Sequence, residues 1–211
     1  MSANLAAKME FSRTLSQEDA ARADFYALLA RLFYGAPDKN LLEQLATAEG
    51  ITAETSQSAL AEAWRTLCET AASANADAVG EEYETLFIGV GKPEVLPFGS
   101  FYLAGFLMEK PLAELRTTLA RMGLAKPAGV VEPEDHFSAL CEVMRYLIQN
   151  ASISAAESLG EQRAFYNKHF GTWNVAFCNA VEQAQHAAFY KAVACFAREF
   201  LVIEVMAFEI D

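Results

Sequence analysis

Hydrophobic residues recur along this chain with the spacing of α-helices. Within residues 25–32, Phe and Leu side chains fall at positions i, i+3, i+4 and i+7. The preceding Ser16, together with Asp19, forms a start that resembles a capping box. Gly35 and Pro37 interrupt the pattern, because neither residue continues a helix readily. The stripe therefore predicts an amphipathic helix that begins near Ser16 and ends near Gly35.

The same spacing predicts a series of further helices, each marked by its own apolar stripe. The stripes consist of Leu41, Leu42 and Leu45; Leu60, Trp64 and Leu67; Val79, Tyr83, Leu86 and Phe87; Leu112, Leu115, Leu119 and Met122; and Phe137, Leu140, Cys141, Met144, Leu147 and Ile148. Ser154 and Glu157 then cap a predicted helix that reaches about His169. Another predicted helical segment covers residues 173–182.

A long apolar segment from about Ala187 to Phe208 ends the sequence. Residues 200–205 include β-branched side chains, but they continue a helical pattern without turn signals. Because the segment is apolar on nearly all sides, we expect a central, buried helix. No part of the sequence alternates polar and apolar residues convincingly between hairpin turns. The pattern thus predicts an all-α protein, a single-domain bundle of about nine to eleven helices.

Two loops that contain glycine and proline, residues 88–98 and 123–131, separate the predicted helices. We expect residues 1–15 to form a poorly ordered N-terminal segment and residues 16–211 to form one all-helical domain. The loop at 123–131 is a candidate hinge through which two protomers exchange helices. The sequence is therefore compatible with a monomer or a domain-swapped dimer.

The composition narrows the class of protein. Of the 211 residues, 53% are hydrophobic, which suffices for a buried core, and the formal net charge is −12. This charge disfavours nucleic acid and anionic membranes and favours basic partners, although acidity that merely keeps an apolar protein dissolved is an equal alternative. No apolar run approaches the roughly 18 residues of a membrane span, and residues 1–16 lack the pattern of a secretory signal. We therefore expect a cytoplasmic protein without stable membrane insertion.

Residues that carry chemistry are few and scattered. Four cysteines are present: Cys68, Cys141, Cys178 and Cys195. They are widely spaced among apolar neighbours, which predicts buried, reduced thiols rather than a metal site. The three histidines also lack metal-ligand spacing, and no nucleophile or nucleotide-binding motif occurs. These observations predict that the protein is not an enzyme and binds no metal.

Two short segments hold residues that a plain helical core does not require. The first, Pro97 to Tyr102, leaves a glycine-rich loop and enters the next helix. Ser100 is a candidate N-cap, and Gly99 permits an unusual backbone angle. The aromatic residues Phe98 and Tyr102 either anchor the loop in the core or contact a ligand.

The second segment, residues 132–136, combines acidic residues, a proline and a histidine. Pro133 suits the first turn of a helix, and Glu132 and Asp135 place negative charge at the positive end of a helix dipole. His136 is not explained in this way, because the dipole disfavours its cation. The segment is therefore either a helix start or a polar binding cluster. A hydrolytic acid–base set of Glu132, Asp135 and His136 is a weaker alternative.

These segments resemble the signature of the TorD/DmsD/NarJ-type chaperones, which mature molybdenum redox enzymes, and are most similar to the TorD/DmsD branch. The family carries a Y-x-x-L-F-like segment, then P-x-G-S-x-Y, then E-P-x-D-H before an apolar helix. The matching segments here are Tyr83–Phe87, Pro97–Tyr102 and Glu132–His136, in the same order. Phe98 stands where many relatives have Trp, so the indole donor is missing. A later aromatic group also resembles the family: Phe165, Phe170 and Trp173.

The resemblance implies a TorD-like, all-α, cytoplasmic chaperone that is not an enzyme. Such a protein would bind the twin-arginine signal peptide and the apo-form of a molybdenum-cofactor oxidoreductase, assist cofactor insertion, and delay export until maturation. Further partners would be the Tat translocase or cofactor-biosynthesis proteins, and GTP is implied by resemblance alone. The alternatives are a helical adaptor or a nucleotide-binding module without an export-linked client.

A leader peptide needs a groove for its apolar part and carboxylates for its arginines. The expected signal-peptide and client-binding residues are Leu86, Phe87, Pro97, Phe98, Gly99, Ser100, Tyr102, Glu132, Pro133, Asp135 and His136. Of these, Glu132 and Asp135 are the expected partners of arginine. A single helix separates the two segments in sequence. We therefore expect Phe98 and Tyr102 to lie near Asp135 and His136, in one cleft with an apolar floor and an acidic lip.

Overall fold

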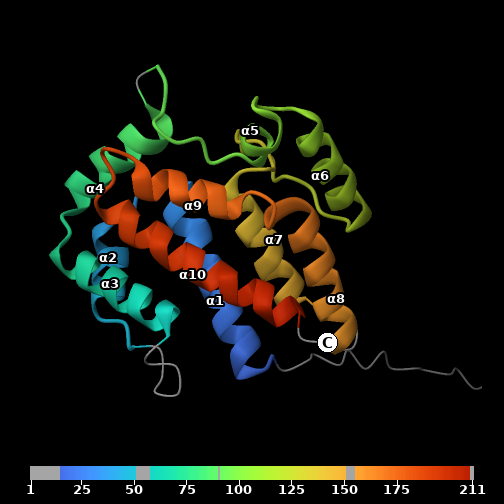
Figure 1. Cartoon of the computed structure of the whole chain (residues 1–211), viewed down its shortest axis with the longest axis horizontal. Coiled ribbons are helices and arrows are strands. Elements are labelled where there is room, and N and C mark those ends of the chain that lie inside the picture. The colour runs from blue at the N-terminus through green and yellow to red at the C-terminus, as the bar shows by residue number, and fades with distance from the viewer. Residues whose placement is uncertain (1–14, 51–57, 90, 151–154, 210–211) are drawn as a thin grey trace, which may run out of the picture.

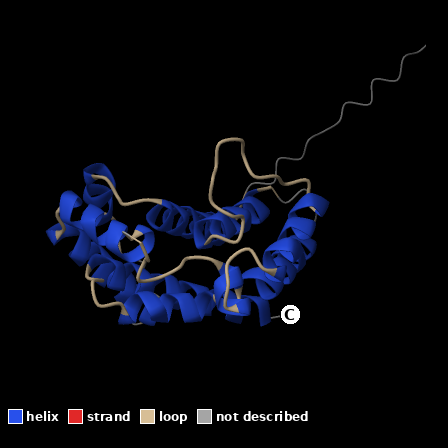
Figure 2. Cartoon of the chain, turned by 90° about the horizontal axis from the view of Figure 1, so that it is seen from above, coloured by secondary structure: helices blue, strands red, loops and turns tan. Residues whose placement is uncertain are grey.

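The computed structural model describes residues 15–50, 58–89, 91–150 and 155–209. In this part of the chain there are ten α-helices, which confirms the predicted all-α fold. They are α1 (Gln17–Tyr34), α2 (Lys39–Ala46), α3 (Ala59–Ser73), α4 (Ala76–Tyr83), α5 (Gly99–Ala104), α6 (Lys110–Arg121), α7 (Phe137–Gln149), α8 (Ala155–Phe165), α9 (Asn174–Gln183) and α10 (Phe189–Glu209). The described residues contain no strand (Figure 2).

Two short π-helical turns lengthen α4 and α8. They are η2 (Glu84–Ile88) and η3 (Tyr166–Phe170). Because η3 continues α8, the helical segment ends at Phe170, one residue beyond the predicted end. The cap predicted at Ser154 lies outside the described residues, as does the predicted disorder of residues 1–14.

Local capping explains where several helices begin. The Oγ atom of Ser16 accepts a 3.0 Å hydrogen bond from the backbone N–H of Asp19, which confirms the predicted start of α1. Asp38 caps α2 in the same manner, through a 2.8 Å hydrogen bond from the N–H of Leu41. α1 ends at Tyr34, directly before the glycine that was expected to stop it.

Helix α10 crosses the centre of the molecule and packs mainly on α3 and α9 (Figure 1). Its first turns are buried almost all round, as the sequence predicts. The last turns are not, and four apolar side chains there are at least 37% exposed: Val202, Ile203, Val205 and Met206. The prediction of a fully buried helix is wrong at this end, because only the face that carries Glu204 and Phe208 is covered.

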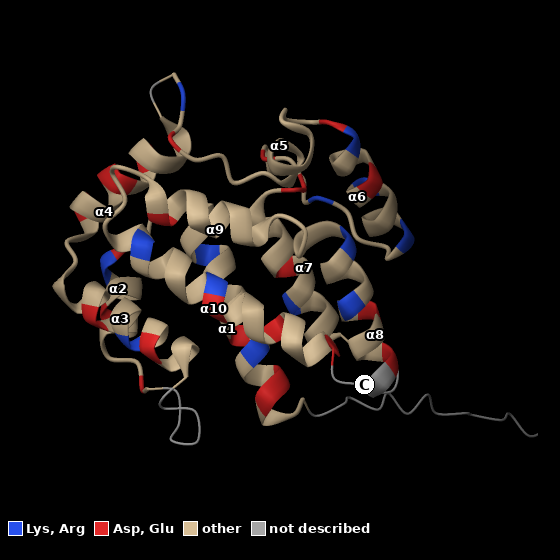
Figure 3. Ribbon diagram, viewed as in Figure 1, with Lys and Arg blue, Asp and Glu red and all other residues tan. Residues whose placement is uncertain are grey.

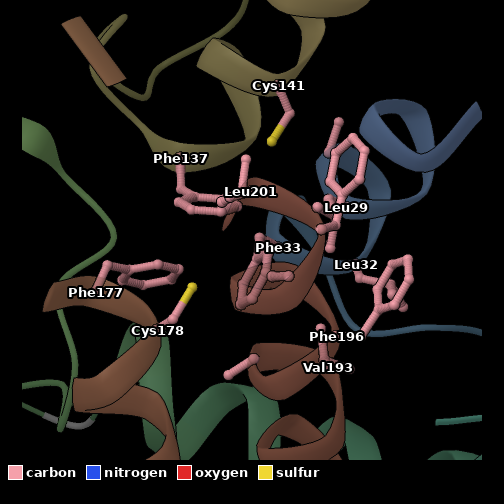
Figure 4. Close-up of a cluster of buried hydrophobic side chains, with 14 of the residues drawn as sticks. Leu29, Leu32, Phe33, Phe137, Cys141, Phe177, Cys178, Val193, Phe196 and Leu201 are labelled. Atoms are coloured by element: carbon pink, nitrogen blue, oxygen red, sulfur yellow. The ribbon is translucent and has the colours of Figure 1, made fainter. Parts of the chain in front are cut away.

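Aromatic side chains from α1, α7 and α9 meet beside α10 (Figure 4). The ring of Phe137 lies 4.6 Å from that of Phe177 and 4.8 Å from that of Phe33, measured between centroids. All three side chains are at most 1% exposed. This cluster fixes the first residue of α7 in the core, directly after the segment 132–136.

All four cysteines are free thiols. Cys141 and Cys178 are completely buried, as predicted, and burial raises the pKa of both thiols. Cys68 and Cys195 are partly exposed, so the prediction of burial is wrong for these two. No group of three or more potential metal ligands occurs in the described ranges. None of the described helices is both long and apolar enough to cross a bilayer.

A buried ion pair connects the two ends of the chain. Arg22 of α1 donates from Nε to Glu204 Oε1 at 2.6 Å and from Nη2 to Glu204 Oε2 at 2.8 Å. Tyr26 donates to the same carboxylate, and Gln162 of α8 accepts from Arg22 at 2.8 Å. Glu204 is only 1% exposed. Its charge is therefore compensated by Arg22 and Tyr26 of α1, and Gln162 connects Arg22 to α8.

Candidate functional site

The segments 97–102 and 132–136 lie directly against each other at the start of α7. The N–H of Gly99 donates to the carbonyl oxygen of Asp135 at 2.9 Å, and the N–H of Phe137 donates to the carbonyl oxygen of Pro97 at 2.8 Å. These bonds form an isolated antiparallel bridge between Phe98 and His136. The expected proximity of the two segments is therefore confirmed.

Asp135 is a structural residue rather than an open binding group. It is 4% exposed, and its Oδ2 accepts a 2.7 Å hydrogen bond from the N–H of Ser100. The carboxylate thus stabilises the first turn of α5, while its Oδ1 is buried without a hydrogen-bond partner among the described residues, and its expected contact with a client arginine stays a prediction. Ser100 is not the N-cap either, because α5 begins at Gly99 with Phe98 as its cap. The Ser100 hydroxyl instead accepts from the N–H of Met108 at 3.2 Å.

His136 is the N-cap of α7, and its Nδ1 accepts a 3.1 Å hydrogen bond from the N–H of Ser138. A helix start therefore does account for this histidine, contrary to the sequence interpretation. Pro133 precedes the cap and lies outside the helix, so its expected place in the first turn is also wrong. The reason is that residues 133–136 form a turn, in which the N–H of His136 donates to the carbonyl oxygen of Pro133 at 3.2 Å, while the bridge to Phe98 holds His136 extended before α7. No hydrogen bond joins His136 to Asp135 among the described contacts, so the alternative acid–base set is not assembled.

Stability is expected to fall in acid because the folded protein keeps His136 neutral. Burial lowers the pKa of this imidazole to about 4, although Glu132 and Asp135 favour its charged form. In the unfolded chain the pKa is about 6.5, so below that pH the unfolded state binds a proton that the folded state does not. The contribution of neutral His136 to the free energy of unfolding is complete above about pH 6.5. It is lost as the pH falls toward about 4, and reaches at most about 3 kcal/mol.

Urea unfolding of the wild type and of His136→Asn, followed from neutral pH into acid, measures this effect. Asn keeps an acceptor for the helix cap and does not titrate. We expect a flatter pH profile for the variant. Part of the pH dependence of stability remains in the variant, because burial lowers the pKa of His169 to about 4 as well. Identical slopes in the two proteins would contradict the prediction.

Gly99 is required for close packing rather than for an unusual backbone angle. It is absent from the glycines with positive φ, but a Cβ atom at this position would lie 2.8 Å from Nε1 of Trp173. Tyr102 stacks on Trp173 with a centroid distance of 5.5 Å, and Phe98 contacts the edge of the His136 ring at 5.1 Å. Phe98 and Tyr102 are both half-buried. These aromatic residues thus hold α5 onto α7 and α9.

Several of the residues expected to contact a client are part of the core. Leu86 is completely buried and Phe87 is 6% exposed. Pro97 is buried beside the bridge. The expectation that Leu86 and Phe87 line an open groove is therefore wrong. Their stripe continues that of α4, and this is the ordinary pattern of a helix face turned into the core.

An open groove of about 630 Å³ does lie beside the bridge. Its walls come from the end of α1, the outer face of α7, the last turn of α6 and the loop residues 124–130 that follow α6. The apolar lining consists of Ala30, Leu119, Leu124, Pro127, Val130 and Val143. Of the expected residues, Glu132, Pro133 and His136 line this groove, whereas Phe98 and Tyr102 do not. The single cleft expected from the sequence is thus only partly present.

Two tyrosines at the rim of the groove were missed by sequence reasoning. Tyr34 is 57% exposed and Tyr146 is 41% exposed, and both line the groove. The sequence does contain a signal for this surface, because Val143 and Tyr146 are apolar or aromatic residues that lie outside the buried stripe of α7. Apolar residues on a second face of an amphipathic helix indicate a contact surface.

Acidic residues are distributed over many helices rather than gathered in one patch (Figure 3). Within the groove most charges are already paired. Glu134 binds Arg116 at 2.8 Å. Partial burial of Glu134 opposes its ionisation, but the hydrogen bond from Arg116 outweighs this effect and keeps the pKa of Glu134 below its usual value. Glu142 binds Arg145 at 2.8 Å. Among the described residues, the carboxylate of Glu132 has no hydrogen bond or ion pair.

Comparisons with known proteins agree with this architecture. Residues 53–179, more than half of the chain, match the family model described as nitrate reductase delta subunit. The "Chaperone protein TorD" of Aliivibrio salmonicida is 26% identical over 199 residues, which are 87% of this chain and 93% of the relative. The "Probable Tat proofreading chaperone DmsD" of Haemophilus influenzae is 29% identical over 118 residues, 55% of either chain.

A solved structure supports the fold alone. The crystal structure titled "Putative Redox Enzyme Maturation Protein" from Archaeoglobus fulgidus superimposes with a TM-score of 0.57 at 19% identity, covering 92% of this chain and 99% of the other. The sequence motifs, the helical fold and the family model lead to the same assignment. This chain belongs to the nitrate reductase delta subunit family, that of the TorD/DmsD-type maturation chaperones.

Proposed function

We propose that this protein is a cytoplasmic maturation chaperone for a molybdenum-cofactor oxidoreductase. In this proposal it binds the twin-arginine leader peptide of its client in the groove between α1 and α7. One observation carries the proposal. The largely apolar groove of about 630 Å³ is lined by Glu132, whose carboxylate no other described group engages.

The chemistry of a twin-arginine leader suits both parts of this groove. The apolar stretch of the leader would lie on the walls, where each large side chain removed from water contributes about 1.5–3 kcal/mol. An arginine would pair with Glu132 by charge-assisted hydrogen bonds. The protein as a whole, with a net charge of −12, attracts a basic peptide before contact.

Such binding would delay export by occupying the leader while the apo-enzyme receives its cofactor. The names of the two curated relatives, a TorD chaperone and a Tat proofreading chaperone, support this role. The protein would act by binding alone, since Asp135 and His136, the residues nearest to an acid–base set, are used to fasten α5 and to cap α7.

Calorimetric titration of the full chain with leader peptides of candidate clients tests the proposal. We expect affinity to fall as salt rises. Val143→Asp places a charge on the groove wall and should weaken binding by about tenfold or more. Val202→Asp is the matched control, because it makes the same change at an exposed position of α10. Failure of all leaders to bind, or equal binding by Val143→Asp and wild type, would disprove the proposal.

A further inference from the structure

The groove offers fewer free carboxylates than its sequence suggests. Three glutamates line it: Glu132, Glu134 and Glu142. Glu134 is held by the Nε and Nη2 atoms of Arg116 at 2.9 and 2.8 Å, and Glu142 is held by Arg145 at 2.8 Å. Asp135, which also belongs to the acidic segment, turns into the protein toward the N–H of Ser100. Glu132 alone among these carboxylates has no partner in the described part of the chain.

Glu132 lines the groove and lies five residues before the first residue of α7. Its charge acts on two neighbours, because it contributes to the raised pKa of Tyr83 after burial and opposes the lowered pKa of His136. Tyr83 in turn donates to the carbonyl oxygen of Tyr34 at 2.8 Å. Lys126 also lines the groove, but its Nζ is 3.3 Å from the carbonyl oxygen of Glu132 rather than bound to its carboxylate.

Further along α7 the groove is lined by apolar and aromatic side chains and by the ion pair of Glu142 and Arg145. Val143 and Tyr146 line it two to three turns further along α7 than His136. At a rise of about 1.5 Å per residue, the ten positions from His136 to Tyr146 span about 15 Å. An extended peptide covers this distance with about four or five residues. Along the direction of α7 the groove therefore offers an unpaired carboxylate before the helix, apolar and aromatic side chains two to three turns later, and room for a short segment.

We propose, on the basis of the proposed function, that the groove binds one of the two arginines of the leader and leaves the other unbound. The arginine nearer to the apolar stretch binds Glu132, and the residues that follow it lie along α7 toward Tyr146. The peptide thus runs in the same direction as α7. The preceding arginine remains in solvent, because a second guanidinium would have to separate Glu134 from Arg116 or Glu142 from Arg145. A lysine at the bound position is a poorer ligand, since it lacks the planar fork that matches a carboxylate.

Fluorescence anisotropy with a labelled synthetic leader, carrying two adjacent arginines before an apolar run, tests this reading. We expect Arg→Gln at the second arginine to weaken binding by about tenfold or more, and the same change at the first arginine to weaken it by less than about threefold. Glu132→Gln should remove the difference between the two peptides. Glu209→Gln, which changes the net charge equally at the exposed end of α10, should preserve it.

A photo-reactive residue in place of Tyr146 tests the direction of the peptide. Cross-links should map to the leader downstream of both arginines, whereas cross-links upstream of them would overturn the inference. Equal losses from the two Arg→Gln peptides would also overturn it, while leaving the proposed function intact. If no leader binds at all, the proposed function fails first. A normal unfolding profile of Glu132→Gln excludes misfolding as the cause of lost affinity.

Discussion

Replacement of Arg22 by Met is expected to lower the free energy of unfolding by about 3–5 kcal/mol, because it leaves a buried charge without its partner. Arg22 makes two hydrogen bonds of 2.6 and 2.8 Å to Glu204, which is 1% exposed. Without the guanidinium, the hydroxyl of Tyr26 is the one donor to this carboxylate that remains among the described residues. Urea unfolding followed by circular dichroism at neutral pH measures the loss.

The double variant Arg22→Met with Glu204→Leu is the informative control. Removal of both charges eliminates the uncompensated carboxylate, and replacement of a buried ion pair by apolar residues is often neutral or stabilising. We therefore expect the double variant to recover most of the loss, apart from about 1 kcal/mol for the hydroxyl of Tyr26, which loses its acceptor. A single variant as stable as the wild type would show that water or another group compensates Glu204.

The helices were largely predictable because their signals are local. The apolar spacing around Leu112 and Leu140 reflects one turn of helix at a time, and the cap at Ser16 uses only atoms three residues apart. The π-helical turns were not predictable in this way. In η3, the N–H of Gly171 donates to the carbonyl oxygen of Tyr166 at 2.7 Å, and the ring of Tyr166 fills the space that a side chain at 171 would occupy. That geometry is set by tertiary packing.

Tertiary contacts also decide where α10 begins. The carboxylate of Glu82, on α4, accepts from the N–H groups of Ala188, Phe189 and Tyr190 at 2.8–3.0 Å. This residue serves as an N-cap for a helix more than a hundred positions away in sequence. The stripe from Ala187 onward indicated that a helix exists there, but no local motif indicated its cap.

The sequence predicted which segments form the candidate site but not how their residues are arranged, because that arrangement also depends on tertiary contacts. The Glu-Pro-Glu-Asp-His sequence reads locally as a helix start at Pro133, yet the helix starts after His136. Residues 133–136 form a turn closed by a hydrogen bond from the N–H of His136 to the carbonyl oxygen of Pro133, and His136 pairs with Phe98. That pairing also buries Asp135 and leaves Glu132 at the groove. Residue types at a site can be read from sequence, but which carboxylate stays available depends on contacts between distant segments.

Replacement of Phe137 by Ala is expected to destabilise the protein by about 3–5 kcal/mol, since it removes the side chain at the junction of the core and the site. The ring is completely buried. Its centroid lies 4.6–5.9 Å from the centroids of four other rings: Phe33, Phe170, Trp173 and Phe177. Thermal and urea unfolding measure the change, and Phe137→Leu, which leaves a smaller cavity, should lose less.

Phe98→Ala separates this core effect from the site. Phe98 is half-buried and contacts the edge of His136, so its removal should cost clearly less stability than that of Phe137, about 1–2 kcal/mol. Because Phe98 does not line the groove, leader affinity should change little at temperatures where the variant is folded. Lost affinity in folded Phe98→Ala would place the leader on α5 as well as on α7. A loss of stability equal to that of Phe137→Ala would instead mean that the bridge between Phe98 and His136 is as important to folding as the aromatic cluster beneath it.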